Sequence, residues 1–158
     1  MASAVICAKA GASVTLVGRS LEKAEKIAGI CNDRYDSKNV KGGADADKSD
    51  FYNAADIVLN TGAAGIQLMS EEHIKNSNTL KICADTNAVP PSGIAGVDVM
   101  DNGKVIDMSP SKCLGIGALA IGNIKYKSQH ECLKLMYTSE KPVYLDFEDA
   151  FKFAQKSV

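Results

Sequence analysis

The stretch that decides the fold class is Ala2-Ser-Ala-Val-Ile-Cys-Ala-Lys-Ala-Gly-Ala-Ser-Val-Thr-Leu-Val-Gly-Arg-Ser20. It runs from a helix of small residues, through a stop at Gly11, into an apolar strand from Ser13 to Val17. This order is typical of the second half of a βαβ unit that binds a dinucleotide. In such a unit a first strand and a G-x-G-x-x-G turn precede the helix and hold the pyrophosphate. Because Met1 stands where that turn would already have ended, we expect the opening strand and turn to be missing.

Strand-like and helix-like segments alternate along the rest of the chain, which favours a parallel sheet covered by helices. We therefore expect an α/β protein with a Rossmann-like, doubly wound parallel sheet that is truncated at its amino terminus. In a sheet of order 3-2-1-4-5 the missing strand is the central one, between the strands at 13–17 and 56–60. With no repeat or linker to divide it, the chain is expected to form one partial NAD(P)-binding domain over residues 1–158.

The individual elements follow from apolar spacing and from capping residues. Ser20 is expected to cap a helix that ends near Ile30, and Asp146 to cap the last helix. The sequence Asp101-Asn-Gly is typical of a hairpin turn. Further strands are expected at 39–41, 56–60 and 80–84, a short helix after Ser70, a loop over 85–96 and a mostly helical segment over 115–137.

Composition argues against several classes of partner. A net charge of −1 leaves no basic stripe for nucleic-acid phosphates. No apolar run approaches the roughly 20 residues that a membrane span needs. We therefore expect a soluble, cytoplasmic protein with neither nucleic acid nor membrane as a partner. The five cysteines are scattered and form no C-x-x-C pair, so reduced thiols are expected and no metal site.

The first candidate binding residues follow the strand at 13–17. NAD sites usually carry an acidic residue there for the ribose hydroxyls, whereas Arg19 beside the hydroxyl of Ser20 suits a 2′-phosphate. Lys23, one helical turn later, adds a second positive charge. The motif therefore predicts NADP. The alternative is that Arg19 and Lys23 are solvated surface charges and that Ser20 is only a helix cap.

A second candidate, Asn60-Thr-Gly-Ala-Ala-Gly65, follows the strand at 56–60. Gly62 and Gly65 would let a ligand approach the backbone closely, and ligands of open α/β sheets bind at the carboxyl ends of strands. The alternative is an ordinary tight turn between a strand and a helix.

The third candidate consists of two glycine-containing segments, Asp85-Thr-Asn-Ala-Val-Pro-Pro-Ser-Gly-Ile-Ala-Gly96 and Leu114-Gly-Ile-Gly-Ala-Leu-Ala-Ile-Gly-Asn-Ile-Lys125. Proline stiffens the first segment, and the glycines of the second allow close packing against a sheet or a ligand. Lys125 is the one charged residue of the second segment. The alternative for Lys125 is a solvated lysine at the edge of an amphipathic helix.

Four segments together resemble the methylene-tetrahydromethanopterin dehydrogenases of methylotrophic bacteria. The likeness keeps its order and spans nearly the whole chain. Its most specific parts are Asn-Ala-x-Pro-Pro-x-Gly-Ile and Leu-Gly-Ile-Gly, whereas the Arg-Ser pair also fits other NADP enzymes, including shikimate dehydrogenases. The four segments are Val17–Ala24, Thr61–Leu68, Ala84–Asp98 and Leu114–Lys127.

Members of that family join an amino-terminal pterin-binding domain to a carboxyl-terminal NAD(P) domain and transfer a hydride directly from the pterin's methylene bridge to the nicotinamide. The resemblance implies that this chain is the NAD(P)-binding part alone, with NADP as the cofactor. Methylene-tetrahydromethanopterin or methylene-tetrahydrofolate would be the substrate of the complete enzyme. By itself the chain is expected to be an inactive fragment. The apolar surface left by truncation favours a homo-oligomer.

The resemblance also suggests roles for individual residues. Lys125 is the candidate catalytic residue, placed to reach the pterin or to tune its reacting nitrogens. The candidate cofactor-binding residues are Arg19, Ser20 and Lys23 for the adenosine phosphate, Thr61, Gly62 and Ala63 for the nicotinamide-ribose side, and Asn87 near the ring.

Two other functions stay open at this point. One is an NADP dehydrogenase of the shikimate type, although such an enzyme is not expected to carry Asn-Ala-x-Pro-Pro. The other is a non-catalytic remnant that binds a nucleotide weakly, or only a partner chain.

Overall fold

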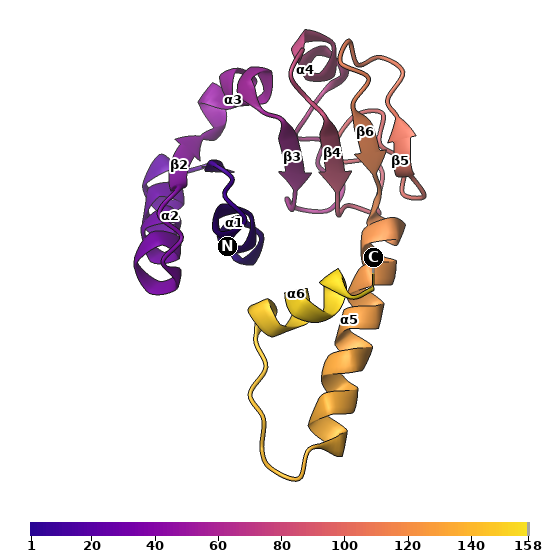
Figure 1. The fold of residues 1–158 in the computed structure, drawn as a ribbon. Helices are drawn as coiled ribbons and strands as arrows, with labels where there is room; N and C mark the ends of the chain where they lie inside the picture. Colours follow the sequence, from indigo (N-terminus) through magenta and orange to yellow (C-terminus); the bar gives the residue numbers. More distant parts are fainter. Residues whose placement is uncertain (158) are drawn as a thin grey trace. The chain divides into compact units, whose positions relative to one another are not determined.

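A computed structural model describes residues 1–157, and the chain divides into two compact units, Met1–Phe51 and Tyr52–Val158 (Figure 1). The sheets of both units are mainly parallel and carry helices, so the expected α/β class is confirmed and is compatible with a Rossmann-like fold. The doubly wound arrangement and the missing central strand stay predictions.

The first unit contains a parallel pair of strands joined by a helix. The strands β1 (Val14–Gly18) and β2 (Val40–Ala44) pair in register from Val14 opposite Val40 to Gly18 opposite Ala44. The other elements of this part of the chain are α1 (Ala2–Lys9), α2 (Leu21–Tyr35), the 3-10 turn η1 (Asp45–Asp47) and the start of α3 (Lys48–Ala54).

Two features hold α2 against β2. A side-chain carbon at Gly42 would overlap the backbone of Ala24 and Glu25, so only glycine lets the helix come this close. Further along α2, the amide of Asn32 donates to the Val40 carbonyl at 2.8 Å and accepts from the Val40 N–H at 3.2 Å. The start of β2 is thereby tied to the helix.

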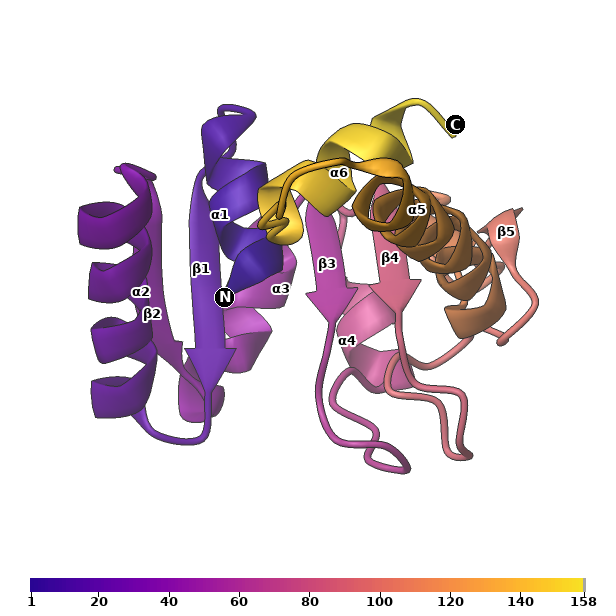
Figure 2. The same ribbon diagram turned by 90° about the horizontal axis from the view of Figure 1, so that it is seen from below.

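The second unit is built on a four-stranded sheet in the order β3-β4-β6-β5. The first three strands are parallel and β5 is antiparallel to β6, as the arrows in Figure 1 show. The helices α5 and α6 lie side by side in both views (Figures 1 and 2). The elements are β3 (Ile57–Asn60), α4 (Glu71–Asn76), β4 (Ile82–Asp85), β5 (Asn102–Val105), β6 (Leu114–Ile116), α5 (Ala118–Thr138) and α6 (Phe147–Gln155).

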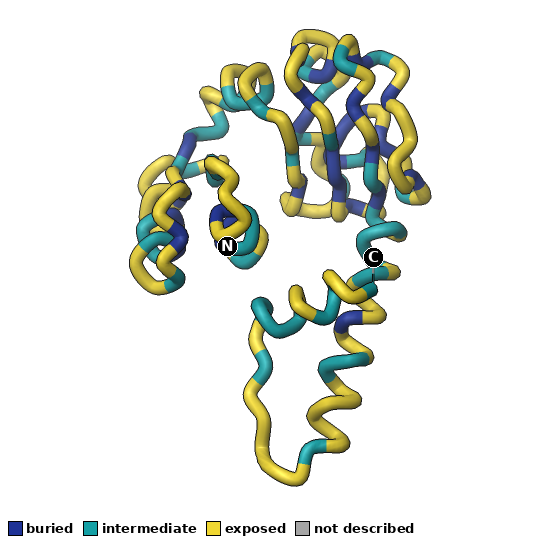
Figure 3. Tube along the Cα trace, viewed as in Figure 1, coloured by how far each residue is buried: buried dark blue, intermediate teal, exposed yellow. Residues whose placement is uncertain are grey.

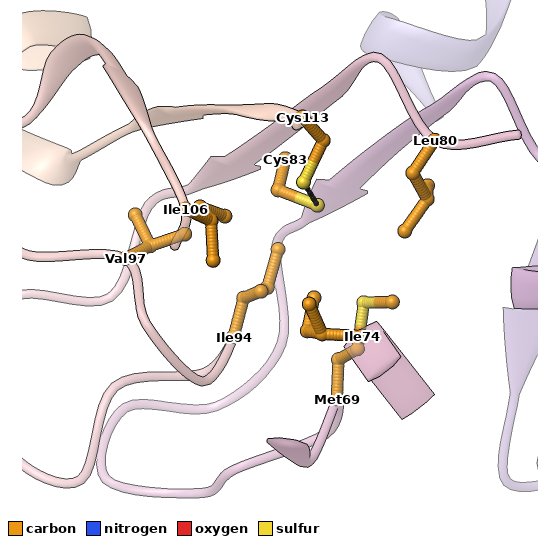
Figure 4. Packing of buried hydrophobic residues seen from close by; sticks show 8 residues of the cluster. All are labelled: Met69, Ile74, Leu80, Cys83, Ile94, Val97, Ile106 and Cys113. Atoms are coloured by element: carbon orange, nitrogen blue, oxygen red, sulfur yellow. Dashed lines mark hydrogen bonds between the residues drawn. The ribbon is translucent and has the colours of Figure 1, made fainter. Parts of the chain in front are cut away.

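An apolar cluster fills the second unit beside its sheet (Figure 4). Burial follows the sheet and the loops next to it, whereas the segment between α5 and α6 is mostly exposed (Figure 3). Within the cluster, the sulfur atoms of Cys83 and Cys113 are 3.9 Å apart. Desolvation, reinforced by the neighbouring Cys113, raises the pKa of the Cys83 thiol well above its usual range. The cluster consists of Met69, Ile74, Leu80, Cys83, Ile94, Val97, Ile106 and Cys113.

Most expected elements are present, with ends shifted by a few residues. The helix capped by Ser20 is longer than expected and ends at Tyr35, after which Asp36 adopts a left-handed conformation with φ of 51°. The short helix after Ser70 and the cap at Asp146 are confirmed, and Ser70 also caps its helix. The short helix α3 was not expected from the sequence.

One local prediction is wrong, and another needs a shifted boundary. The sequence Asp101-Asn-Gly does not turn a hairpin, because Asn102 already begins β5 and the connection to β6 lies between Ile106 and Cys113. The segment expected to be mostly helical over 115–137 is confirmed as α5, although its first two residues belong to β6. Leu-Gly-Ile is too short to display the alternation of a strand, and its pairing with β4 outweighs the helical pattern of the residues that follow.

Among residues 1–157, no helix combines the length and apolar character required to cross a membrane. The same described residues contain no group of three or more His, Cys, Asp or Glu side chains arranged to hold a metal ion.

Cysteine burial predicts two classes of thiol. Cys7 and Cys132 are half-buried, whereas Cys31, Cys83 and Cys113 are buried. Because a thiol reagent needs access to a thiolate, we expect rapid labelling of the first two cysteines, and labelling of all five only after denaturation. Mass spectrometry of timed labelling reactions measures the rate at which each cysteine is modified. Rapid modification of Cys83 in the folded chain would contradict the packing described above.

Candidate functional site

Two polar side chains meet where β3 and β4 end. Asn60 is the last residue of β3 and Asp85 the last of β4, and the two residues are opposite each other in the parallel register. The Asn60 amide donates to Asp85 Oδ1 at 2.7 Å. Their exposed fractions are 6% and 1%, so the pair is enclosed by protein. Carboxyl ends of parallel strands are the usual place for a ligand site, and this pair lies directly at such an edge.

The Asp85 carboxylate accepts two further hydrogen bonds. Its Oδ1 also accepts from the backbone N–H of Asn87 at 3.0 Å, and its Oδ2 accepts from the N–H of Ile94 at 3.0 Å. A buried carboxylate is costly unless its oxygens are hydrogen-bonded, and here both oxygens are engaged. Asp85 thus fixes the segment that follows its own strand at two points.

Asn60 and Asn87 extend this network to the loop that follows β3. Asn60 Oδ1 accepts from the N–H of Gly62 at 3.0 Å. Asn87 Oδ1 accepts from the N–H groups of Gly65, at 3.3 Å, and Val89, at 2.9 Å, while its amide donates to the Pro91 carbonyl at 2.9 Å. We call residues 61–68 the Thr61 loop and residues 86–93 the Pro90 loop.

The far ends of the two loops are also joined. The N–H groups of Leu68 and Met69 donate to the Gly93 carbonyl at 2.8 and 3.0 Å, and the N–H of Ala95 donates to the Met69 carbonyl at 2.9 Å. The loops therefore form one hydrogen-bonded unit, anchored at one end by Asp85 and at the other by a residue of the apolar cluster.

Two glycines of this unit lie close to neighbouring side chains. A side-chain carbon at Gly93 would overlap the Asn60 amide nitrogen and would lie 2.9 Å from Asp85 Oδ1. One at Gly62 would lie 2.5 Å from a methyl group of Leu68. The Pro90 loop also contains a cis peptide bond between Pro90 and Pro91.

The structure brings together the site residues expected from the Thr61 loop and from Asn87. Thr61, Gly62 and Ala63 are exposed beyond the end of β3, so their backbone is accessible to a ligand. Asn87 is 5% exposed, and its amide is hydrogen-bonded to both loops. Its expected place beside a nicotinamide ring stays a prediction.

The residues expected to bind the adenosine phosphate lie together at the start of α2. Ser20 caps this helix, with its hydroxyl oxygen accepting from the Lys23 N–H at 3.4 Å. Arg19 and Lys23 are both exposed. The helix-cap role of Ser20 is thus observed, and the hydroxyl proton is still available for donation to an anion. Two cationic side chains beside a helix N-terminus form a favourable environment for phosphate.

Lys125 lies apart from these two groups along the chain. It is an exposed residue of α5, eight residues after the N-terminal cap Gly117, which corresponds to about 12 Å along the helix axis. The glycines of the preceding Leu-Gly-Ile-Gly segment serve packing. A side-chain carbon at Gly115 would meet Asp101, and one at Gly117 would overlap the Asp98 carbonyl.

Sequence reasoning missed the side chains of Asn60 and Asp85 as site residues. The available signal was their position, because each is the first polar residue after an apolar run, in Ile-Val-Leu-Asn60 and Ile-Cys-Ala-Asp85. Polar residues at the ends of buried parallel strands are well placed to organise a ligand site.

Two known proteins are similar in sequence to this chain over nearly its whole length. No family model matches the chain. An NAD(P)-dependent methylenetetrahydromethanopterin dehydrogenase of Methylorubrum extorquens is 38% identical over 155 residues, which cover 96% of this chain and 52% of that protein. The chain is related to methylenetetrahydromethanopterin dehydrogenases. A second relative from the same organism, bifunctional protein MdtA, is 35% identical over 149 residues, or 92% of this chain and 50% of MdtA.

The chain thus spans about half the length of the curated relatives that it matches. The resemblance expected from the four sequence segments is confirmed, and it extends over nearly all of this chain.

Gly93 provides a test of the loop network. We expect Gly93→Ala to lower the free energy of unfolding by about 1–3 kcal/mol, because the added methyl group displaces Asn60 from Asp85. Gly122→Ala is the control, since Gly122 lies in α5 with open space around it. That change should raise stability by about 0.5–1 kcal/mol through helix propensity. Urea unfolding measures both variants, and equal stability of Gly93→Ala and wild type would disprove the crowding.

Proposed function

We propose that this chain binds NADP and forms the nucleotide-binding part of a dehydrogenase that transfers a hydride from a methylene-tetrahydropterin to NADP. The observation that carries the proposal is the 38% identity, over 96% of this chain, to a protein named as an NAD(P)-dependent methylenetetrahydromethanopterin dehydrogenase. The organised loops at the ends of β3 and β4 support it, because parallel sheets bind their ligands at that edge.

In this proposal the 2′-phosphate of NADP binds at the start of α2. The planar guanidinium of Arg19 suits a bidentate contact with phosphate, and Lys23 adds a point charge one turn later. The exposure of both side chains leaves them accessible to such a ligand. Because no acidic residue accompanies Arg19 and Ser20 directly after β1, the ribose hydroxyls of NAD would lack their usual acceptor.

The nicotinamide end would bind at the Thr61 loop. Thr61, Gly62 and Ala63 have small side chains and exposed backbone, so a flat ring and its ribose can approach closely. Asn87 would act beside the ring by holding the Thr61 and Pro90 loops together. NADP supplies the hydride-accepting ring when bound, while the chain's own residues fix its orientation and exclude water.

Lys125 is proposed to act on the pterin side of the reaction. A lysine ammonium donates up to three hydrogen bonds and can stabilise negative charge on a pterin carbonyl or nitrogen. We infer that the residues completing the pterin site belong to the half of the dehydrogenases that this chain does not match. A methylene-tetrahydrofolate would offer the same reacting bridge and stays an alternative substrate.

We also propose that the chain acts as part of a homo-oligomer in the cytoplasm. Large apolar side chains are exposed along α5, and burial of such a surface against a second copy would be favourable. These side chains belong to Tyr126, Leu133, Met136 and Tyr137.

The name of the relative that is 38% identical favours a pterin dehydrogenase over a shikimate-type enzyme. A non-catalytic remnant is distinguished by assay: the complete gene product should reduce NADP with methylene-tetrahydromethanopterin, and a remnant should not.

Cofactor preference is the first test of the proposed site. We expect Arg19→Ala to weaken NADP binding roughly ten- to a hundredfold, equivalent to about 1.5–3 kcal/mol for a lost charge-assisted contact. Binding of NAD should stay the same, because NAD lacks the 2′-phosphate. Arg34→Ala is the matched control, since Arg34 is an exposed arginine at the other end of α2. Calorimetric titration of the complete gene product measures both cofactors, and an unchanged NADP-to-NAD ratio in Arg19→Ala would reject the assignment.

Lys125 is tested by steady-state kinetics of the complete gene product. Removal of a lysine that contacts the pterin should lower kcat/KM at least tenfold, or about 1.4 kcal/mol, while NADP affinity stays near that of wild type. The control Lys127→Ala removes another exposed lysine from α5. Equal kinetics of Lys125→Ala and Lys127→Ala would identify Lys125 as a solvated helix residue, and a loss of NADP binding would assign it to the cofactor.

A further inference from the structure

We propose that Asp85 is a positioning residue, which holds the Thr61 loop and the Pro90 loop in the one arrangement that receives the nicotinamide end of the cofactor. The proposal rests on the proposed function for the identity of the ligand. It concerns a buried side chain that would not touch the cofactor and would act through the loops that do.

The hydrogen bonds of Asp85 reach both loops. One oxygen accepts from the Asn60 amide at 2.7 Å and from the N–H of Asn87 at 3.0 Å, and the other accepts from the N–H of Ile94 at 3.0 Å. Asn60, which is held by Asp85, in turn accepts a 3.0 Å hydrogen bond from the N–H of Gly62. A single carboxylate therefore sets the start of one loop and both ends of the other.

The chemistry of this position requires a carboxylate. Three donors converge on Asp85, and an ionised carboxyl group offers acceptor sites on both of its oxygens. An asparagine of the same shape would turn an N–H₂ group toward at least one of these N–H donors. Because a buried donor without an acceptor is unfavourable, the loops would shift to relieve the mismatch.

The apolar cluster holds one of the hydrogen-bond partners of Asp85 in place. Ile94, whose N–H donates to Asp85, is fully buried in the apolar cluster. By contrast, Thr61, Gly62 and Ala63 are exposed and have small side chains that bury little apolar surface. The arrangement of that exposed backbone therefore depends on hydrogen bonds that lead back to Asp85, and not on packing of its own.

Asp101 provides a matched control. It is also a buried carboxylate of the second unit, with an exposed fraction of 7%, and its Oδ2 accepts from the backbone N–H of Asp98 at 2.8 Å. Its other oxygen lies 3.8 Å from Lys104 Nζ, next to β5. Asp101→Asn thus makes the same chemical change in a similarly buried place, without a contact to the Thr61 or Pro90 loop.

Saturation-transfer NMR with NADP⁺ as the probe tests the proposal on the full 158-residue chain. The method detects weak binding and reports separately on nicotinamide and adenine protons. Wild type and Asp101→Asn should transfer saturation to both rings. In Asp85→Asn the nicotinamide signal, relative to the adenine signal, should fall at least fivefold. A merely destabilising change would lower both signals together, and an unchanged ratio in a folded Asp85→Asn chain would overturn the proposal.

A second variant protects the test against a failure to fold. Asn60→Ala removes the link between Asp85 and Gly62, while the hydrogen bonds of Asp85 to Asn87 and Ile94 remain. It should shift the nicotinamide-to-adenine ratio in the same direction as Asp85→Asn. If Asp85→Asn does not fold, an Asn60→Ala ratio equal to that of wild type would overturn the proposal by itself.

Hydrogen exchange separates this proposal from the proposed function. Peptides that cover residues 61–68 and 86–95 should exchange at least tenfold faster in Asp85→Asn than in Asp101→Asn, whether or not a ligand is present. If wild type transfers no saturation to either ring of NADP⁺, the proposed function fails and the cofactor role of Asp85 fails with it. Loop exchange equal to that of Asp101→Asn would overturn the positioning role even if NADP⁺ binds normally.

Discussion

The candidate site depends on the hydrogen bond between Asn60 and Asp85 at the end of two paired strands. Parallel pairing places the last residue of β3 opposite the last residue of β4, so these polar side chains meet at the edge where the chain leaves the sheet. Each side chain then holds the backbone of a loop. The loop conformation and the accessible backbone beyond β3 therefore follow from this pairing of two strand ends.

The hydrogen-bonded loops of the site are attached to the apolar cluster of the second unit. Met69 and Ile94 belong to the apolar cluster and also take part in the backbone pairing that closes the two loops. Packing thus fixes the far ends of the loops, and polar contacts fix the near ends. This division suits a binding site, because the stretch between the two ends can present bare backbone to a ligand without carrying side chains of the core.

Local sequence signals predicted the elements that depend on local interactions. Ser20 and Asp146 could be assigned as caps because a cap requires only the residues next to it. The strand β6 could not be assigned, since three residues have no readable period and gain their structure from β4. Asn60 and Asp85 were missed for a similar reason. They are 25 residues apart, and only the register of the sheet brings them together.

In the proposed NADP site, the contact between α2 and β2 has a consequence for how cofactor preference can change during evolution. Because the helix rests directly on the backbone at Gly42, it has no layer of side chains across which it could slide. The N-terminus of α2 is consequently held at a set height above the strand. A relative that evolves a different cofactor preference would have to exchange the side chains around that terminus while the helix stays in place. Substitutions at Arg19 and Lys23 would then be the accessible route, and longer or shorter connections after β1 would be selected against.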